Sequence, residues 1–106
     1  MKGLSILGST GSIGTNVLRV VDAFPGRFEV VGLAAGGNVE TLAEQVARHR
    51  PKVVSVADAD ALARLSRLVD LSGLRAVVGR EGMVEVATRP EARMVVASAV
   101  GAVGLV

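Results

Sequence analysis

LSILGSTGSIG, residues 4–14, gives the clearest indication of how this chain folds. The apolar run Leu4 to Leu7 leads directly into Gly8, Gly11 and Gly14, three glycines spaced three residues apart, and apolar residues at helical spacing follow. This order predicts a strand, a tight turn and a helix. Glycines let the backbone bend sharply and approach a ligand closely, and the N–H groups at a helix N-terminus favour negative charge. The stretch therefore predicts a phosphate-binding loop.

The spacing of these glycines is G-x-x-G-x-x-G, which differs from the G-x-G-x-x-G of the commonest dinucleotide fingerprint. By itself the motif indicates only an anionic nucleotide, and the alternative is a glycine-rich turn that merely joins a strand to a helix. Its position favours the nucleotide, because doubly wound folds place their first phosphate loop after the first strand.

Composition limits the class of protein. The chain has 106 residues, half of them apolar, which is enough for one domain with a real core. Its 12 basic and 10 acidic residues give a net charge of +2, the basic residues are scattered, and the only aromatic residues are two phenylalanines. We therefore expect no nucleic-acid partner. The absence of cysteine excludes disulfides, thiolate metal ligands and a cysteine nucleophile, and is compatible with the cytoplasmic location that we expect.

Neither end of the chain has the pattern of a membrane segment. The apolar run near Met1 is too short for a signal peptide. Residues 94–106 are apolar almost throughout, but Gly101 and Gly104 interrupt them and they fall short of the roughly 20 residues that span a bilayer. We expect no membrane partner. Because the chain stops within this apolar run, we also expect it to be the front part of a longer protein.

Apolar segments and helical patterns alternate along the whole chain, with no linker between them. This predicts a single α/β domain over residues 1–106, with a Rossmann-like, doubly wound, mainly parallel sheet of about five strands and helices on both faces. The predicted strands are residues 4–7, 28–35, 53–56, 74–78 and 94–98. The predicted helices are residues 12–24, a helix that begins after Asn38 and ends before His49, a helix capped by Asp58 or Asp60 and stopped by Gly73, and residues 81–88.

Helical spacing also predicts which side chains face the core. The inward residues are expected to be Ile13, Val17, Leu18, Val20, Val21 and Phe24 in the first helix, Val39, Leu42, Ala43 and Val46 in the second, Leu62, Leu65 and Leu68 in the third, and Val84 and Ala87 in the fourth. His49, beside Arg48 and Arg50, is expected to be a solvated surface residue.

A second informative stretch, Ala34 to Asn38, lies where the second strand ends. A domain that prefers NAD usually carries an acid here, which binds the ribose hydroxyls and repels a 2′-phosphate. This chain has no acid between Glu29 and Glu40. Instead Gly36, Gly37 and the capping residue Asn38 lead into a helix, which makes a small anion site from backbone N–H groups and favours NADP. The alternative is an ordinary start of a helix, in which the glycines only turn the chain.

These residues together resemble one family, 1-deoxy-D-xylulose 5-phosphate reductoisomerase, along the whole chain. The similar segments are residues 4–14, 35–39, 42–45, 79–87 and 97–105. Several separated motifs in the correct order are more specific than the first loop alone. The resemblance implies part of the NADPH-dependent enzyme of non-mevalonate isoprenoid biosynthesis, which converts 1-deoxy-D-xylulose 5-phosphate to 2-C-methyl-D-erythritol 4-phosphate by skeletal isomerisation and reduction.

The resemblance also implies the residues that bind NADPH. Thr10, Gly11, Ser12 and Ile13 would line the pyrophosphate, Gly36, Gly37 and Asn38 would surround the adenosine end with its 2′-phosphate, and Ala99 and Gly101 would lie where the nicotinamide half passes. Some family members carry lysine where this chain has Gly37. NADPH selectivity would then depend on the backbone site or on a basic residue elsewhere.

The family uses a divalent metal, Mg or Mn, held by acidic side chains, and binds a sugar phosphate substrate. The resemblance implies that these residues come from later segments, so we expect no catalytic residue and no metal ligand in this chain, and no activity from it alone. Asp58, Asp60 and Asp70 are interpreted as caps and helix-end residues. The full-length enzyme is expected to be a homodimer.

Two other functional interpretations are compatible with the same glycine motifs. One is the nucleotide domain of another NADP-linked reductase, which the full-length protein's substrate would distinguish. The other is a free-standing nucleotide-binding module, which predicts that the reading frame ends near Val106.

Overall fold

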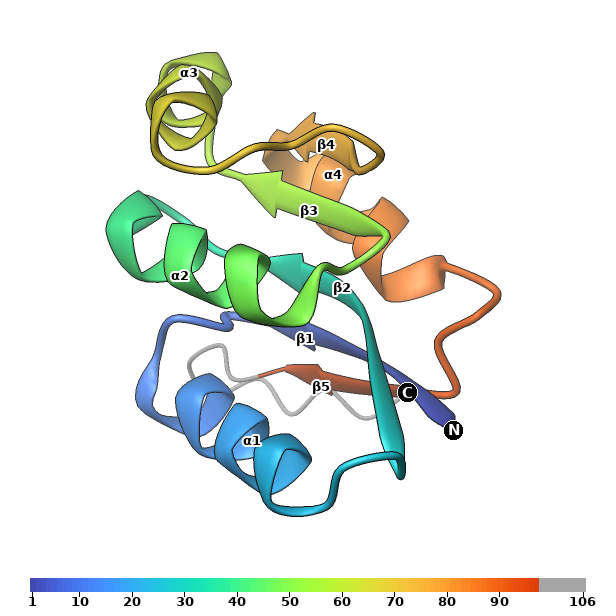
Figure 1. Cartoon of the computed structure of the whole chain (residues 1–106). Helices are drawn as coiled ribbons and strands as arrows, with labels where there is room; N and C mark the ends of the chain where they lie inside the picture. The colour runs from blue at the N-terminus through green and yellow to red at the C-terminus, as the bar shows by residue number, and fades with distance from the viewer. Residues whose placement is uncertain (98–106) are drawn as a thin grey trace.

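The structure is a computed structural model that describes residues 1–97, over which strands and helices alternate (Figure 1). The elements are β1 (Lys2–Leu7), α1 (Ser12–Ala23), β2 (Phe28–Ala34), α2 (Val39–His49), β3 (Val53–Val56), α3 (Ala59–Leu68), β4 (Arg75–Val78), α4 (Gly79–Thr88) and β5 (Met94–Ala97). The predicted order of elements is confirmed. Gly73 does not stop α3, because that helix ends at Leu68 and Gly73 instead takes a positive φ of 80° in the turn before β4.

The strands form one parallel sheet in the order β4-β3-β2-β1-β5. From β1 the chain adds strands in one direction as far as β4, and then returns to place β5 on the other side of β1. This reversal is the signature of a doubly wound sheet, so the Rossmann-like α/β prediction is confirmed.

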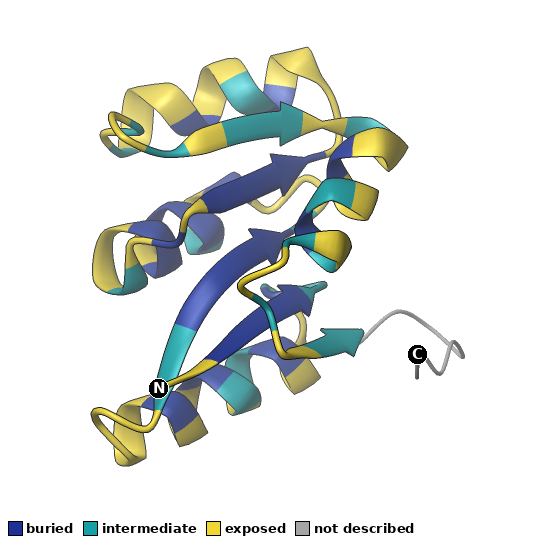
Figure 2. Ribbon diagram, turned by 90° about the vertical axis from the view of Figure 1, so that its right-hand side faces the viewer, coloured by how far each residue is buried: buried dark blue, intermediate teal, exposed yellow. Residues whose placement is uncertain are grey.

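The reversal also explains the layers. Parallel crossovers are right-handed, so α1, α2 and α3 cover one face of the sheet and α4, which connects strands in the opposite direction, covers the other (Figure 1). β1, β2 and β3 are largely buried between these layers, whereas the edge strands β4 and β5 are half exposed (Figure 2). The larger core cluster lies under the three helices and a smaller one, Ala34, Val53 and Val86, lies under α4.

The second and third helices follow the predicted pattern closely. In α2 all four expected residues are buried, and Asn38 and Asp58 cap α2 and α3 by accepting hydrogen bonds from the N–H groups of Thr41 and Ala61. In α3 Leu65 is buried and Leu62 partly so, but the expected inward position of Leu68 is wrong, since that side chain is half exposed.

The prediction for α1 is wrong at Ile13, Val20 and Phe24, which are each about half exposed. The six apolar residues of this helix cover two adjacent stripes, and a helix on a sheet buries a stripe only about 100° wide. The stripe of Leu18 and Val21 faces the core. Periodicity alone could not tell which of the two stripes the sheet covers.

In α4 the expected inward residue Val84 is 55% exposed, and Gly82 and Val86 face the sheet instead. Gly82 lies against Ser55, and a Cβ on Gly32 would come within 2.9 Å of Val86 Cγ1. Small residues on both sides therefore let α4 approach the sheet closely, which a pattern based on large apolar residues could not reveal. Among residues 1–97, no helix has the length and apolar character needed to cross a bilayer.

Candidate nucleotide-binding site

The two predicted loops lie side by side at the carboxyl edge of the sheet. They follow β1 and β2, which are neighbouring parallel strands, and the strand order reverses between β1 and β5. The N–H groups of Gly8 and Ser9 both donate to the carbonyl oxygen of Ala34, at 2.8 and 3.0 Å. In doubly wound sheets a ligand binds at such a reversal, so the topology places both loops where a nucleotide is expected.

The glycines of the first loop have different structural tasks. Gly8 has a φ of 81°, which L side chains rarely adopt, and its carbonyl oxygen accepts the N–H of Gly11 at 3.1 Å to close the turn. Gly14 packs α1 onto the loop, because a Cβ there would lie 2.5 Å from the carbonyl oxygen of Gly8 and 2.6 Å from Ser9 Cα. Gly11 has an ordinary φ of −80° and is exposed, so its backbone conformation is one that other residues also adopt.

The N-terminus of α1 is open to a ligand. Its N-cap is Gly11, no side chain of residues 1–97 caps it, and its first turn contains no acid. Gly11, Ser12 and Ile13 are exposed, and Thr10 is half-buried. The first N–H groups of a helix have no acceptor within the helix, so this end attracts an anion. The arrangement suits the pyrophosphate predicted for Thr10, Gly11, Ser12 and Ile13.

The second loop is exposed at Gly36, Gly37 and Asn38, and in the described part of the chain nothing lies within 4 Å of a Cβ built on either glycine. The side-chain oxygen of Asn38 accepts the N–H of Thr41 at 3.3 Å, as the predicted cap requires. Glu40 lies in the first turn of α2. Its negative charge opposes an anion there, so this helix end is a weaker anion site than the N-terminus of α1.

A buried link between the first loop and α2 was missed in the sequence. Ser9 is fully buried, its hydroxyl donates to Gln45 Oε1 at 2.8 Å, and Gln45 Nε2 donates to the carbonyl oxygen of Ser9 at 2.8 Å. In the sequence, the position of Gln45 between Leu42 and Val46, on the apolar face of α2, could have indicated this link. A polar residue on such a face needs a buried partner.

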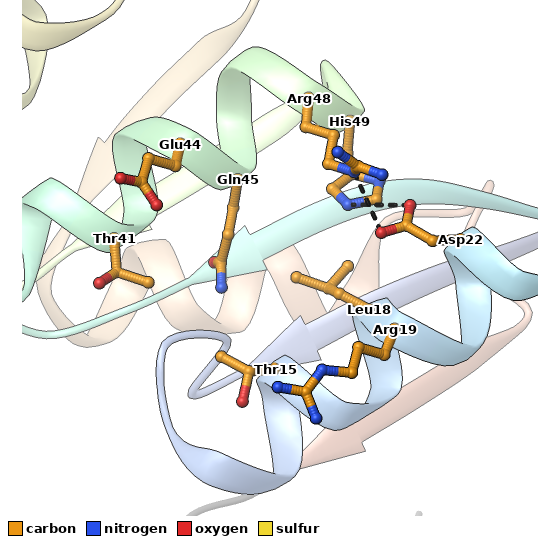
Figure 3. A pocket seen from close by; sticks show the side chains of 9 residues that line it. All are labelled: Thr15, Leu18, Arg19, Asp22, Thr41, Glu44, Gln45, Arg48 and His49. Atoms are coloured by element: carbon orange, nitrogen blue, oxygen red, sulfur yellow. Dashed lines mark hydrogen bonds and ion pairs between the residues drawn. The ribbon is translucent and has the colours of Figure 1, made fainter.

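The groove between α1 and α2 begins near this link (Figure 3). Thr41 lies at one end, with Gln45 next along the groove. At the other end Asp22 of α1 accepts a hydrogen bond from Arg48 Nε at 3.0 Å and lies 3.8 Å from His49 Nε2. The side chain of His49 is only 9% exposed, so the prediction of a solvated residue is wrong. Burial lowers the pKa of His49, Asp22 opposes that shift, and Arg48 adds to it.

The sequence analysis also expected no metal ligand in this chain and assigned Ala99 and Gly101 to the nicotinamide half of the cofactor. Within residues 1–97 no cluster of three or more His, Asp or Glu side chains is placed to hold a metal ion. Ala99 and Gly101 lie outside the described residues.

Comparison with known proteins identifies the family. The family model for 1-deoxy-D-xylulose 5-phosphate reductoisomerase matches residues 4–106. The chain belongs to this reductoisomerase family. The resemblance inferred from the separated sequence motifs is therefore confirmed.

Curated reductoisomerases match nearly the whole chain. The enzyme of Symbiobacterium thermophilum is 55% identical over 108 residues, which cover 98% of this chain and 28% of the relative. That of Synechocystis is 50% identical over 109 residues, 99% of this chain and 27% of the relative. The chain therefore spans little more than a quarter of the length of these relatives.

Solved reductoisomerases have the same fold. One, in complex with NADPH, fosmidomycin and magnesium, superimposes with a TM-score of 0.86 at 30% identity over 95% of this chain and 25% of its own. Another, from Zymomonas mobilis and in complex with NADPH, gives 0.74 at 31% identity over 81% of this chain and 23% of its own.

Proposed function

We propose that residues 1–106 form the NADPH-binding domain of a 1-deoxy-D-xylulose 5-phosphate reductoisomerase. The observation that carries the proposal is the meeting of two glycine loops at the point where the strand order reverses. Solved family members in complex with NADPH, which share the fold, support it.

In this proposal each loop binds one part of the cofactor. Thr10, Gly11, Ser12 and Ile13 bind the pyrophosphate through backbone N–H groups at the N-terminus of α1. Gly36, Gly37 and Asn38 bind the adenosine end with its 2′-phosphate. Since β5 is the neighbour of β1, the nicotinamide half passes toward the segment after β5, where Ala99 and Gly101 follow in the sequence.

The chemistry of the whole protein depends on more than this chain. Bound NADPH supplies the hydride for the reduction that follows isomerisation of the sugar phosphate. Residues 1–97 bind and orient the cofactor but contain no metal cluster, so we propose that the acids for Mg or Mn and the residues for the substrate come from other segments. This chain alone is then inactive, and the full-length enzyme is a cytoplasmic homodimer.

Selectivity for NADPH rests on backbone groups in this proposal. Gly37 offers no charge to the 2′-phosphate, and Glu40 opposes it. The open space around Gly36 and Gly37 lets a phosphate reach the N–H groups of the loop. We therefore expect a preference for NADPH over NADH that is smaller than in family members with lysine at this position.

Calorimetric titration of the purified chain with NADPH and, separately, with NADH tests the proposal. Tighter binding of NADPH is the expected result. Equal binding, or a preference for NADH, would contradict the assignment of the second loop, and binding of neither nucleotide would contradict the function proposed for this chain.

A further inference from the structure

We propose that Gln45 is a positioning residue that sets the separation of the two nucleotide-binding loops and thereby contributes to NADPH selectivity. Gln45 lies on α2, is 8% exposed and forms two hydrogen bonds with Ser9 in the first loop. The inference rests on the function proposed above, because it concerns how the same site is held together.

The chemistry of this link requires a primary amide. The carbonyl oxygen of Ser9 can only accept, so Nε2 of Gln45 must face it, and Oε1 is then left to accept the serine hydroxyl proton. A glutamate would point a carboxylate oxygen at the carbonyl, and an apolar residue would leave two buried polar groups without partners. Glutamine is the residue that provides both a donor and an acceptor at this reach.

Ser9 forms hydrogen bonds with one residue before the second loop and one residue after it. Its N–H donates to the carbonyl oxygen of Ala34, the last residue of β2, and its hydroxyl and carbonyl bind Gln45. The second loop, residues 36–38, lies between these two anchors. Two backbone hydrogen bonds, from the N–H of Ala35 to Ser55 at 2.9 Å and from the N–H of Ala57 to Gly36 at 3.4 Å, hold the second loop to β3 and the residue after it. The bonds of Ser9 instead connect the two flanks of the second loop to the first loop, so they contribute to the separation of the two loops.

This arrangement affects most strongly a ligand that uses both loops. In the proposed pose NADPH places its pyrophosphate on the first loop and its 2′-phosphate on the second. A fixed separation lets both groups bind without ordering the loops first, which increases affinity. NADH lacks the 2′-phosphate, so it depends less on the separation.

The test is the variant Gln45→Met, which keeps the length of the side chain and removes both hydrogen bonds. We expect the Kd for NADPH to rise roughly tenfold, the size of effect typical of losing buried hydrogen bonds, and the Kd for NADH to rise less. The Kd ratio, defined as the Kd for NADH divided by the Kd for NADPH, should therefore fall several-fold. Ser9→Ala keeps the bond from Nε2 to the carbonyl and should change the ratio in the same direction by a smaller factor.

The control is Val46→Ala, which weakens the core contact of the next residue on α2 without touching the link. It should lower the melting temperature and leave the Kd ratio unchanged. If Gln45→Met prevents folding, Ser9→Ala provides the same readout. A Kd ratio unchanged in folded Gln45→Met or Ser9→Ala, or changed equally by Val46→Ala, would overturn the inference while leaving the function intact. Failure of the unmodified chain to bind either nucleotide would overturn both.

Discussion

Gly11 and Gly14 both belong to the first loop, but their surroundings differ, so we expect substitutions at the two positions to have different effects. Gly14 is buried against the backbone of Gly8 and Ser9, whereas Gly11 is exposed at the N-terminus of α1 with an ordinary backbone conformation. One is needed for packing and the other, in our proposal, for the ligand. Their variants should therefore separate stability from binding.

Gly11→Val places a branched side chain where the pyrophosphate is proposed to lie. We expect loss of detectable NADPH binding in calorimetry, with a melting temperature within a few degrees of the unmodified chain. Ser66→Val, which adds a valine to the exposed face of α3, is the matched control and should bind normally. Retention of NADPH affinity in Gly11→Val would refute the assignment of this loop.

Gly14→Ala should instead destabilise the fold. Its Cβ would overlap backbone atoms that cannot move without displacing the loop, so we expect a loss of about 2–3 kcal/mol in the free energy of unfolding, measured with urea. Gly36→Ala, with nothing near its Cβ, should change stability by less than about 0.5 kcal/mol. Equal effects of the two substitutions would contradict the packing described for α1.

At the scale of elements, α2 is joined to the first loop by Gln45 and Ser9, and to α1 by Arg48 and His49 with Asp22 at the far end of the groove. The stability contributed by the contacts at the far end depends on pH. Because burial lowers the pKa of His49 below its ordinary value of 6.5, the unfolded chain binds this proton more tightly than the folded chain.

Neutral His49 contributes to the stability of the fold in full above the pKa that this side chain has in the unfolded chain. The contribution is lost as the pH falls through the lower pKa that it has in the folded chain. We expect the melting temperature to decrease between about pH 7 and pH 5 and the decrease to be smaller in His49→Gln. Asp70 and Glu85, whose pKa values are also lowered by their hydrogen bonds, act at lower pH, below the ordinary carboxyl range. An identical pH profile in His49→Gln would show that this histidine is not the group responsible.

The docking of α4 depends on small residues. In Gly82→Ala the new Cβ would overlap Ser55 Oγ, and we expect a loss of about 1–3 kcal/mol in the free energy of unfolding. Ser55→Gly in the same chain removes the overlapping atom and should restore part of that loss, which a double-mutant cycle measures. Additive losses in the cycle would mean that the two residues are not in contact.

At the scale of the whole molecule, the two core clusters lie on opposite faces of the same sheet. β1, β2 and β3 contribute to both layers, so neither layer can separate without exposing the strands that the other covers. We expect one cooperative unfolding transition in urea, with the same midpoint by circular dichroism and by amide signals in NMR. An earlier midpoint for α4 would contradict the proposal of a single domain.

The order of elements, the parallel doubly wound class, the cap at Asn38 and the family could all be predicted from the sequence, because they depend on local patterns: apolar runs, glycine spacing and capping residues. For α3 these patterns left Asp58 and Asp60 as alternative caps, and the structure selects Asp58. The tertiary structure alone decided which apolar stripe of α1 is buried, which face of α4 meets the sheet, and the pairing of Ser9 with Gln45 and of Asp22 with His49. These outcomes depend on contacts between residues far apart in the chain. A helical period defines a stripe but not its partner, and a polar residue on that stripe signals a need for a hydrogen bond without naming the residue that satisfies it.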